Sequence, residues 1–280
     1  MNVLEIKNLT KSYPGFTLDN LNLALPSGCI MGLIGENGAG KSTTIKLILD
    51  MIHKDRGSII IFGKDNGDGI ELIKEDVGVV MDEVGIPECL TVRQVGNVMK
   101  YTFQNWDEVE YARLVQKLAL PDKKQFKEFS RGMKMKLGIA IALSHHAKLL
   151  ILDEATSGLD PVVRDEVVEM FSDFTRDENH SILISSHIVS DLEKLCDYIA
   201  FLHNGKLLLC EEKDQLLAEY GLIHCTADEL QSLPSDAVKY KKENAYGVEA
   251  MVLRSALPSG IHVSPISIEE LFVFMVKETK

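Results

Sequence analysis

The first part of the chain alternates between hydrophobic and polar residues. The alternation runs through residues 3–10 and 17–25, and Pro14 and Gly15 lie between these stretches. A period of two that is interrupted by turn residues predicts two antiparallel strands joined by a tight turn. The apolar stretch 29–35 does not alternate in this way, so it predicts a strand that is buried on both faces.

A helical pattern follows over residues 41–52, and further short apolar runs then alternate with helical stretches. This order predicts an α/β core with a mostly parallel sheet and flanking helices, to which the first two strands add an antiparallel β subdomain. The apolar runs that predict the later strands are 58–62, 77–81, 149–153 and 181–185.

The strand signal disappears between Thr91 and Ser144, where three helical patterns follow one another. They predict an inserted helical subdomain at about residues 86–146. Residues 198–210 predict a β-hairpin, because Asn204-Gly205 separates two apolar runs.

After Gly221 the pattern restarts with short strand-like pieces and ends in a helical pattern over residues 267–278. We therefore expect a main domain over residues 1–218 and a small C-terminal α/β accessory domain over residues 219–280.

The composition is that of an ordinary globular protein, with 45% hydrophobic and 26% charged residues in a chain of 280. The net charge of −12 argues against a nucleic-acid partner, because contacts to many phosphates require a basic surface. It does not argue against one bound nucleotide, which needs only a local loop. No apolar run approaches the ~20 residues that span a bilayer. We therefore expect any role at a membrane to depend on a separate membrane protein.

Five scattered cysteines form no CxxC pair, which favours reduced thiols in the cytosol over disulfides or a zinc site. The first residues include charged side chains and no apolar core of a signal peptide. The adjacent His145 and His146 lack the spacing of metal ligands, and we expect them in a loop.

The segment GENGAGKS, residues 35–42, lies between a predicted strand and a predicted helix. It has the P-loop pattern, in which glycines allow consecutive backbone N–H groups to point at phosphate oxygens. Lys41 is placed to reach the terminal phosphates, and the Ser42 hydroxyl is suited to Mg²⁺. The pattern predicts a P-loop NTPase core that binds ATP and Mg²⁺. The predicted nucleotide ligands in the loop are Asn37, Gly38, Ala39, Gly40, Lys41, Ser42 and Thr43.

A second pattern, LLILDEA at residues 149–155, is an apolar strand that ends in two acidic residues. Taken alone, such a strand end is more often solvated surface. In the same chain as a P-loop, it predicts that Asp153 holds Mg²⁺ and that Glu154 acts as a general base or orients the attacking water.

These two patterns occur with FSRGMKMKLGIAIAL and ISSH in the order and spacing of ATP-binding cassette (ABC) ATPases. The resemblance covers about Leu4 to Glu212, and the tail is similar to the C-terminal extension of the bacterial drug- and peptide-exporter branch (ABC-2 type). It implies an ATPase at the cytoplasmic face of the cell membrane that powers a separate transmembrane permease. It further implies a homodimer or a pair with a paralogous ATPase subunit. The implied cargo is drugs, antimicrobial or amphipathic peptides, or lipids.

The resemblance also implies roles for single residues. Tyr13 matches the aromatic residue that stacks on adenine, and an exposed turn tyrosine is the alternative. His187 matches the histidine that contacts the γ-phosphate, which completes a catalytic set with Lys41 and Glu154. Asp160 matches the D-loop at the dimer interface. The matched signature motif, which contacts the ATP of the other subunit, is Ser130, Arg131, Gly132 and Met133.

Three positions depart from the family pattern, and the change at one of them, Ala155 in place of a common proline, is minor. Arg131 replaces a more usual glycine, and Asp82, followed by Glu83, occupies the place of the Q-loop glutamine. Because an aspartate serves a hard divalent cation at least as well as an amide oxygen does, we expect Asp82 to join Ser42 and Asp153 at Mg²⁺. The hypothesis is an active ATPase with a modified Q-loop.

The surface between Glu83 and Tyr101 is predicted to contact the permease. Two other functions compete with this interpretation. One is a nucleotide-binding regulatory module that hydrolyses ATP weakly, which Asp82 and Arg131 favour. The other is a soluble ABC ATPase that acts on ribosomes or DNA, but the sequence shows no fused second cassette, coiled-coil arm or basic patch.

Overall fold

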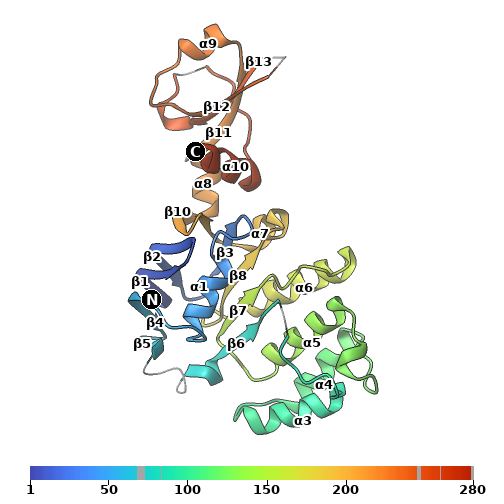
Figure 1. Cartoon of the computed structure of the whole chain (residues 1–280). Coiled ribbons are helices and arrows are strands. Elements are labelled where there is room, and N and C mark those ends of the chain that lie inside the picture. The colour runs from blue at the N-terminus through green and yellow to red at the C-terminus, as the bar shows by residue number, and fades with distance from the viewer. Residues whose placement is uncertain (68–72, 83, 245–246, 259, 279–280) are drawn as a thin grey trace.

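The computed structural model describes residues 1–67, 73–82, 84–244, 247–258 and 260–278. Its largest sheet has six strands in the order β10-β9-β3-β8-β7-β6. All pairs in this sheet are parallel except the edge pair β10 and β9. The predicted α/β fold is therefore confirmed (Figure 1). The strands are β3 (Ile30–Gly35), β6 (Val77–Val80), β7 (Leu149–Asp153), β8 (Ser181–Ser186), β9 (Tyr198–His203) and β10 (Lys206–Glu212).

A second sheet is antiparallel and has the order β2-β1-β4-β5. Its strands β1 (Asn2–Tyr13) and β2 (Phe16–Pro26) are the two alternating strands that the sequence predicts. The strand β4 (Arg56–Ile61) also lies here, beside β1, and the short β5 (Lys64–Asp65) forms the edge.

The position of β4 corrects the sequence analysis, which grouped this strand with those of the parallel sheet. Ile59 and Ile61 are buried, whereas Ser58 and Ile60, which alternate with them, are only partly covered. The strand thus alternates in burial, as strands with one covered face do. Ile60 hides this alternation in the sequence, since it is as apolar as its two isoleucine neighbours.

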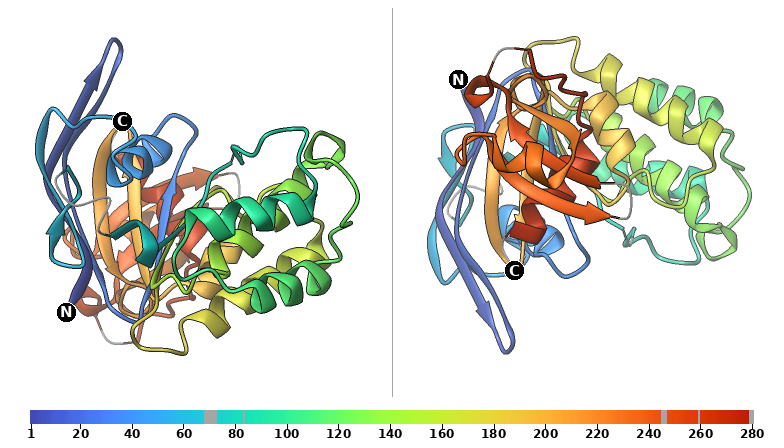
Figure 2. Two further views of the ribbon diagram at one scale, coloured as in Figure 1. Left: turned by 90° about the horizontal axis from the view of Figure 1, so that it is seen from below. Right: turned by 90° about the horizontal axis from the view of Figure 1, so that it is seen from above.

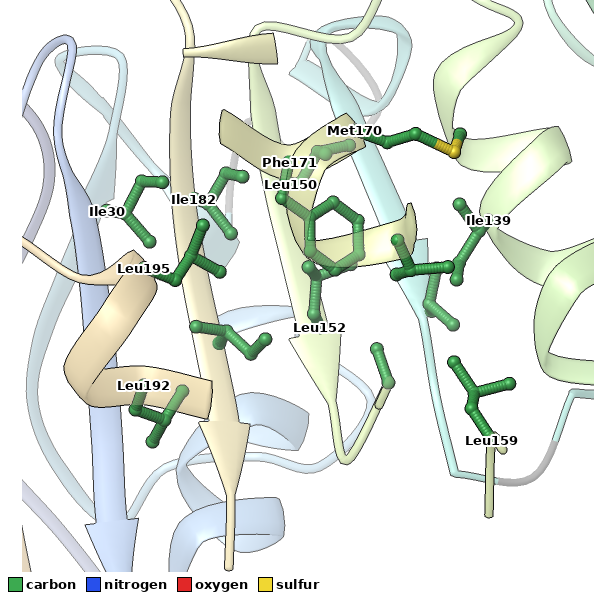
Figure 3. Packing of buried hydrophobic residues seen from close by; sticks show 14 of the residues in the cluster. Ile30, Ile139, Leu150, Leu152, Leu159, Met170, Phe171, Ile182, Leu192 and Leu195 are labelled. Carbon is green, nitrogen blue, oxygen red and sulfur yellow. The ribbon is translucent and has the colours of Figure 1, made fainter. Parts of the chain in front are cut away.

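Alternate side chains of the parallel strands enter two different cores. Ile30 and Ile34 of β3 belong to one core, and Met31 and Leu33 belong to the other. Both faces of the sheet are therefore covered, which explains the continuous apolar runs in the sequence. Figure 3 shows the first core, where Phe171 packs among side chains of the sheet and of helices on the same face.

The helices that cover the first core are α5 (Arg131–Leu143), α6 (Pro161–Phe174) and α7 (Val189–Leu195). The second core lies between the parallel sheet and the antiparallel sheet, and α1 (Lys41–Ile48) contributes to it. The pattern predicted this helix over 41–52, but the helix ends earlier because Asp50 adopts a left-handed conformation with φ of 51°.

The predicted helical insert is present as α3 (Val92–Thr102), α4 (Glu108–Lys117) and α5, which contact one another (Figure 2). Each helix begins at a residue whose side chain accepts a hydrogen bond from the first turn. These N-cap residues are Thr91, Asp107 and Ser130.

His145 and His146 lie in the turn after α5, where a loop was expected. His145 is nevertheless buried, and its ring stacks on Phe103 with the ring centroids 4.0 Å apart. Burial lowers the pKa of this imidazole below its ordinary value. The sequence analysis did not anticipate this burial, because residues in turns are usually exposed.

The predicted hairpin of β9 and β10 has Asn204 with φ of 46° and Gly205 with φ of 77° at its turn. The Gly205 N–H donates to the carbonyl of Ala39 at 2.9 Å, and the Gly205 carbonyl accepts from the N–H of Asp19 at 2.8 Å. A Cβ at Gly205 would lie 1.9 Å from the carbonyl oxygen of Thr17. The turn therefore requires glycine and joins the antiparallel sheet to the glycine-rich loop.

The C-terminal residues form a three-stranded antiparallel sheet in the order β11-β13-β12. This sheet lies at one end of the molecule, beyond the parallel sheet (Figure 1). The predicted terminal helix is α10. The elements of this part are α8 (Lys213–Glu219), β11 (Tyr220–Cys225), α9 (Ala227–Gln231), β12 (Val238–Asn244), β13 (Gly247–Leu253) and α10 (Ile268–Glu278).

The C-terminal part packs against the main domain through α10, which contacts α7. The ring of Phe272 lies 5.1 Å from the ring of Phe201 in β9, and Leu271 is fully buried in the first core. The predicted domain boundary at residue 219 lies where α8 ends and β11 begins. The residues before and after this boundary share apolar contacts in the first core. Among the described residues, no helix combines the length and the apolar character needed to cross a membrane.

We expect Leu271→Ala to lower the free energy of unfolding by about 2–5 kcal/mol, because it leaves a cavity in a packed core. Urea unfolding followed by circular dichroism measures the change. Val273→Ala is the matched control, since Val273 lies on the same helix with 42% of its surface exposed. Equal effects of the two substitutions would contradict the contribution of α10 to the core.

Candidate functional site

Four segments meet at the carboxyl ends of neighbouring parallel strands. The glycine-rich loop follows β3, Asp82 lies just after β6, Glu154 follows β7, and His187 follows β8. These strands are neighbours in the sheet in the order β3-β8-β7-β6. Open parallel sheets bind ligands at this edge. The fold therefore brings together segments that are far apart in the sequence.

The glycine-rich loop depends on glycines at three places. Gly38 and Gly40 have φ of 83° and 113°, which other residues rarely adopt. At Gly35 a Cβ would lie 2.5 Å from the carbonyl oxygen of Leu202 in the neighbouring strand. The loop leads directly into α1, which begins at Lys41 and has no acidic residue in its first turn. Its free backbone N–H groups and the helix dipole favour an anion at this end.

Lys41 is buried, and its side chain reaches back into the glycine-rich loop that precedes α1. Its Nζ donates to the carbonyl of Gly35 at 2.7 Å and lies 3.9 Å from Oε1 of Glu154. Burial lowers the pKa of Lys41, and the nearby charges of Glu154 and Asp153 partly offset this effect. The ammonium group is thus held where it faces both the loop and the acidic strand end.

Asp153, the last residue of β7, is buried. The Ser185 hydroxyl of the adjacent strand β8 donates to Oδ1 of Asp153 at 2.6 Å. Ser185 is a site residue that the sequence analysis did not single out. The signal that points to it is the pair of serines after the three apolar residues of SILISS, because buried hydroxyls need partners.

Glu154 has φ of 55°, an uncommon conformation for a residue other than glycine. The Glu154 N–H donates to the backbone carbonyl of Ser185 and lies 3.2 Å from the Ser185 hydroxyl. These contacts hold the conformation of Glu154. Oε2 of Glu154 lies 2.5 Å from Nδ1 of His187. The turned backbone thus directs the Glu154 carboxylate between Lys41 and His187, as expected for a group that acts on a bound phosphate.

Asp82 forms an ion pair and hydrogen bond with the guanidinium of Arg131, the first residue of α5. Two residues that depart from the family pattern therefore contact each other. The Arg131 stem also lies beside the loop after β7, since a Cβ added at Gly158 would be 3.2 Å from its Cδ. Glu83, the acidic residue that follows Asp82 in the sequence, lies outside the described residues.

The other residues matched to the signature motif and the D-loop lie at helix starts. Ser130 caps α5 by accepting from the N–H of Met133 at 3.3 Å, as predicted from sequence. Asp160 caps α6 by accepting from the N–H of Val163 at 3.2 Å. Gly132 lies beside the D-loop, where its Cβ would be 3.2 Å from the carbonyl oxygen of Gly158.

A cavity of about 900 Å³ opens over the glycine-rich loop. The predicted Ala39 and Asp153 are buried and are not among the described residues that line it. Tyr13 is 42% exposed and is not among the described residues that line the cavity, whereas Phe16 from the same hairpin is. The lining residues are Gly15, Phe16, Glu36, Asn37, Gly38, Gly40, Lys41, Ser42, Thr43, Asp82, Arg131, Glu154, Ser157, His187 and Asn204.

The family model described as ABC transporter matches residues 18–157. The lantibiotic transport ATP-binding protein SrtF of Streptococcus pyogenes is 41% identical over 218 residues, which cover 76% of this chain and 92% of SrtF. The bacitracin transport ATP-binding protein BcrA of Enterococcus faecalis is 36% identical over 215 residues, which cover 74% of this chain and 68% of BcrA.

A solved structure of an ATP binding subunit of an ABC transporter is 30% identical and superimposes with a TM-score of 0.70, covering 77% of this chain and 92% of that chain. The matched family region contains both the glycine-rich loop and the strand that ends in Asp153 and Glu154. These similarities agree with a cavity in which a phosphate-binding loop faces a lysine and an acidic residue. The chain belongs to the ABC transporter family and is an ATP-binding, ATP-hydrolysing subunit of that family.

Proposed function

We propose that this chain powers a membrane exporter of drugs, of antimicrobial or other amphipathic peptides, or of lipids. The observation that carries the proposal is the convergence of Lys41, Glu154 and His187 on one cavity above the P-loop. The names of SrtF and BcrA, which refer to lantibiotic and bacitracin transport, support a peptide or drug cargo. ATP hydrolysis in this cavity would drive the movement of a separate permease at the cytoplasmic face of the cell membrane.

The residues present suit a magnesium ion that is bound together with ATP. The described residues contain no group of three or more His, Cys, Asp or Glu side chains that could hold a metal alone. Mg²⁺ in nucleotide sites needs only one or two protein carboxylates, since phosphates and waters complete its coordination. Asp153, Ser42 and Asp82 are the side chains that we assign to it. When bound, the ion neutralises charge on the phosphates.

The remaining steps are assigned to side chains of this chain. Lys41 binds the terminal phosphates, because its ammonium lies at the start of α1 within the loop. Glu154 accepts a proton from the attacking water or orients that water. His187 positions the Glu154 carboxylate through the 2.5 Å contact and contacts the γ-phosphate once ATP is bound. We assign adenine stacking to the hairpin that carries Tyr13 and Phe16.

We further propose that two ATPase subunits enclose ATP between them. Ser130, Arg131, Gly132 and Met133 would then contact the ATP of the other subunit, and Asp160 would lie near the subunit interface. The first turn of α5 begins at Arg131, directly after Ser130, and the start of a helix attracts an anion, which supports this role. The partner is a second copy of this chain or a paralogous ATPase, and no nucleic acid takes part.

We assign the contact with the permease to the surface that includes α3, next to Asp82. Two exposed apolar side chains support this assignment, since Tyr101 is 91% and Val98 is 44% exposed. A cavity of about 520 Å³ lies beside this region and is lined in part by Val84, Ile86 and Phe129. Apolar surface of this kind is typical of a binding site for another protein.

We expect Glu154→Gln to reduce steady-state release of phosphate from Mg–ATP by at least about 100-fold while ATP binding persists, because general-base catalysis contributes roughly 10²–10⁴-fold. Glu166→Gln is the control, since Glu166 is exposed on α6. If the parent chain and Glu154→Gln both released phosphate near background, the weakly hydrolysing regulatory module would be the better function.

We expect Ser185→Ala to raise the Mg²⁺ concentration needed for half-maximal hydrolysis by about 10-fold, because residues that orient metal ligands contribute 10–100-fold to metal affinity. A Mg²⁺ titration of the ATPase rate measures this. Ser186→Ala is the matched control, since the hydroxyl of buried Ser186 accepts from the N–H of Ile188 instead. Equal titration curves for the two variants would contradict the role of Ser185.

We expect tagged Glu154→Gln protein, extracted with ATP from its native membranes in a mild detergent, to retain a multi-span membrane protein in stoichiometric amount. Mass spectrometry identifies the partner. Tyr101→Ser should reduce its recovery, whereas Val109→Ser, which changes a side chain 80% exposed on α4, should not. A preparation without a membrane protein, in detergents that preserve transporters, would favour the soluble ATPase or the regulatory module.

A further inference from the structure

We infer that Asp82 exchanges between two partners, Arg131 and the magnesium ion of Mg–ATP, so that occupancy of the nucleotide cavity controls Arg131 in the signature segment of the same chain. Arg131 is thus a positioning residue, which acts on the metal through Asp82. The inference rests on the proposed role of Asp82 at Mg²⁺, and it adds a link between the two nucleotide sites of an ATPase pair.

The first support is that two unusual residues meet. Asp82 and Arg131 lie 49 positions apart and form an ion pair with a direct hydrogen bond. A glutamine at position 82 and a glycine at position 131, the residues more usual at these places, would not form an ion pair. The two substitutions are therefore best understood together, as one interaction.

The second support is the location of the pair. Asp82 and Arg131 line both the 900 Å³ cavity over the P-loop and the 520 Å³ cavity beside Val84 and Phe129. The pair therefore separates the nucleotide cavity from the region that we assign to the permease. Arg131 also lies beside Gly158, in the segment matched to the D-loop, where an added Cβ would be 3.2 Å from its Cδ, so a movement of Arg131 would reach a third segment of the site.

The third support is the strength expected of the pair. The side chains of Arg131 and Asp82 are 56% and 47% exposed, so water screens their attraction. An ion pair this exposed shifts an equilibrium by a factor of up to about 5, which a bound cation of double charge readily overcomes. Because Arg131 and the metal compete for the Asp82 carboxylate, Arg131 weakens metal binding. Metal binding weakens the ion pair of Asp82 with Arg131 to the same extent.

The consequence for an ATPase pair follows from the placement of the signature motif. Once Mg²⁺ takes Asp82, the guanidinium of Arg131 is free at the start of α5, beside the amides that face the other subunit's ATP. Filling one site thus supplies a cation to the second site. Without nucleotide, the same cation stays paired within its own subunit.

The test is a double-mutant cycle on the full chain with Glu154→Gln, which prevents turnover. The probe is the fluorescent analogue N-methylanthraniloyl-ATP, and the readout is the Mg²⁺ concentration at half of the Mg²⁺-dependent increase in binding. Arg131→Met keeps the aliphatic stem but removes the charge. We expect it to lower this midpoint about 3- to 5-fold, and to have no effect when Asp82→Gln is also present.

Two controls separate positioning from general charge effects. Arg131→Lys keeps a charged partner for Asp82 and should leave the midpoint within about 2-fold of the parent. Lys134→Met removes the same charge one turn along α5, where Lys134 lies over the ring of Phe126, and should not change the midpoint. Thermal unfolding by circular dichroism confirms that each variant is folded.

The inference is overturned if Arg131→Met leaves the midpoint unchanged or shifts it equally with and without Asp82→Gln. It is also overturned if Arg131→Met weakens probe binding in EDTA in both backgrounds, because Arg131 would then contact the phosphates of its own subunit directly. Either result leaves the proposed ATPase function intact, since the parent still binds the probe. Failure of the parent to bind the probe would overturn the proposed function together with this inference.

Discussion

The pairing of β7 with β8 fixes the position of the two acidic groups on which the proposed ATPase mechanism depends. In this register Asp153 lies opposite Ser185, whose hydroxyl donates to the Asp153 carboxylate. The N–H of the next residue, Glu154, donates to Ser185 in turn. Glu154 is thereby turned into the cavity toward His187. A slip of one residue would move every side chain of β7 to the opposite face of the sheet. The chemistry thus depends on the apolar packing that holds this register.

The sequence alone points to those parts of the candidate site that are encoded locally, namely the glycine-rich loop and the acidic strand end, and the structure places both at the same edge of the sheet. The role of Ser185 depends on pairing between strands, so a local pattern contains only a hint of it. Whether Tyr13 or Phe16 faces the cavity depends on the conformation of a hairpin tip, where neighbouring side chains point in different directions. The contact of Asp82 with Arg131 joins residues that only the assembled fold brings together.

The fold was predictable to a similar extent and for a similar reason. Periodicity identified the buried strands and the helical insert, because burial on one or two faces leaves a direct trace in the sequence. It did not show which sheet β4 joins, since a run of isoleucines fits either sheet. Nor did it show that the C-terminal helix α10 enters the first core, where Phe272 lies beside Phe201. β9, which carries Phe201, pairs with the strand that leads into the P-loop.

The hairpin turn at Gly205 has a consequence for motion. Its amide binds the carbonyl of Ala39 in the P-loop, and its carbonyl binds Asp19 in the antiparallel sheet whose tip carries Phe16. The wall of the cavity near Phe16 and the glycine-rich loop at its floor are thus linked through one turn. A change in cavity width would then come from the opposite side, where Asp82 and α5 meet. In such a change the helical insert would move against a wall and floor that stay together.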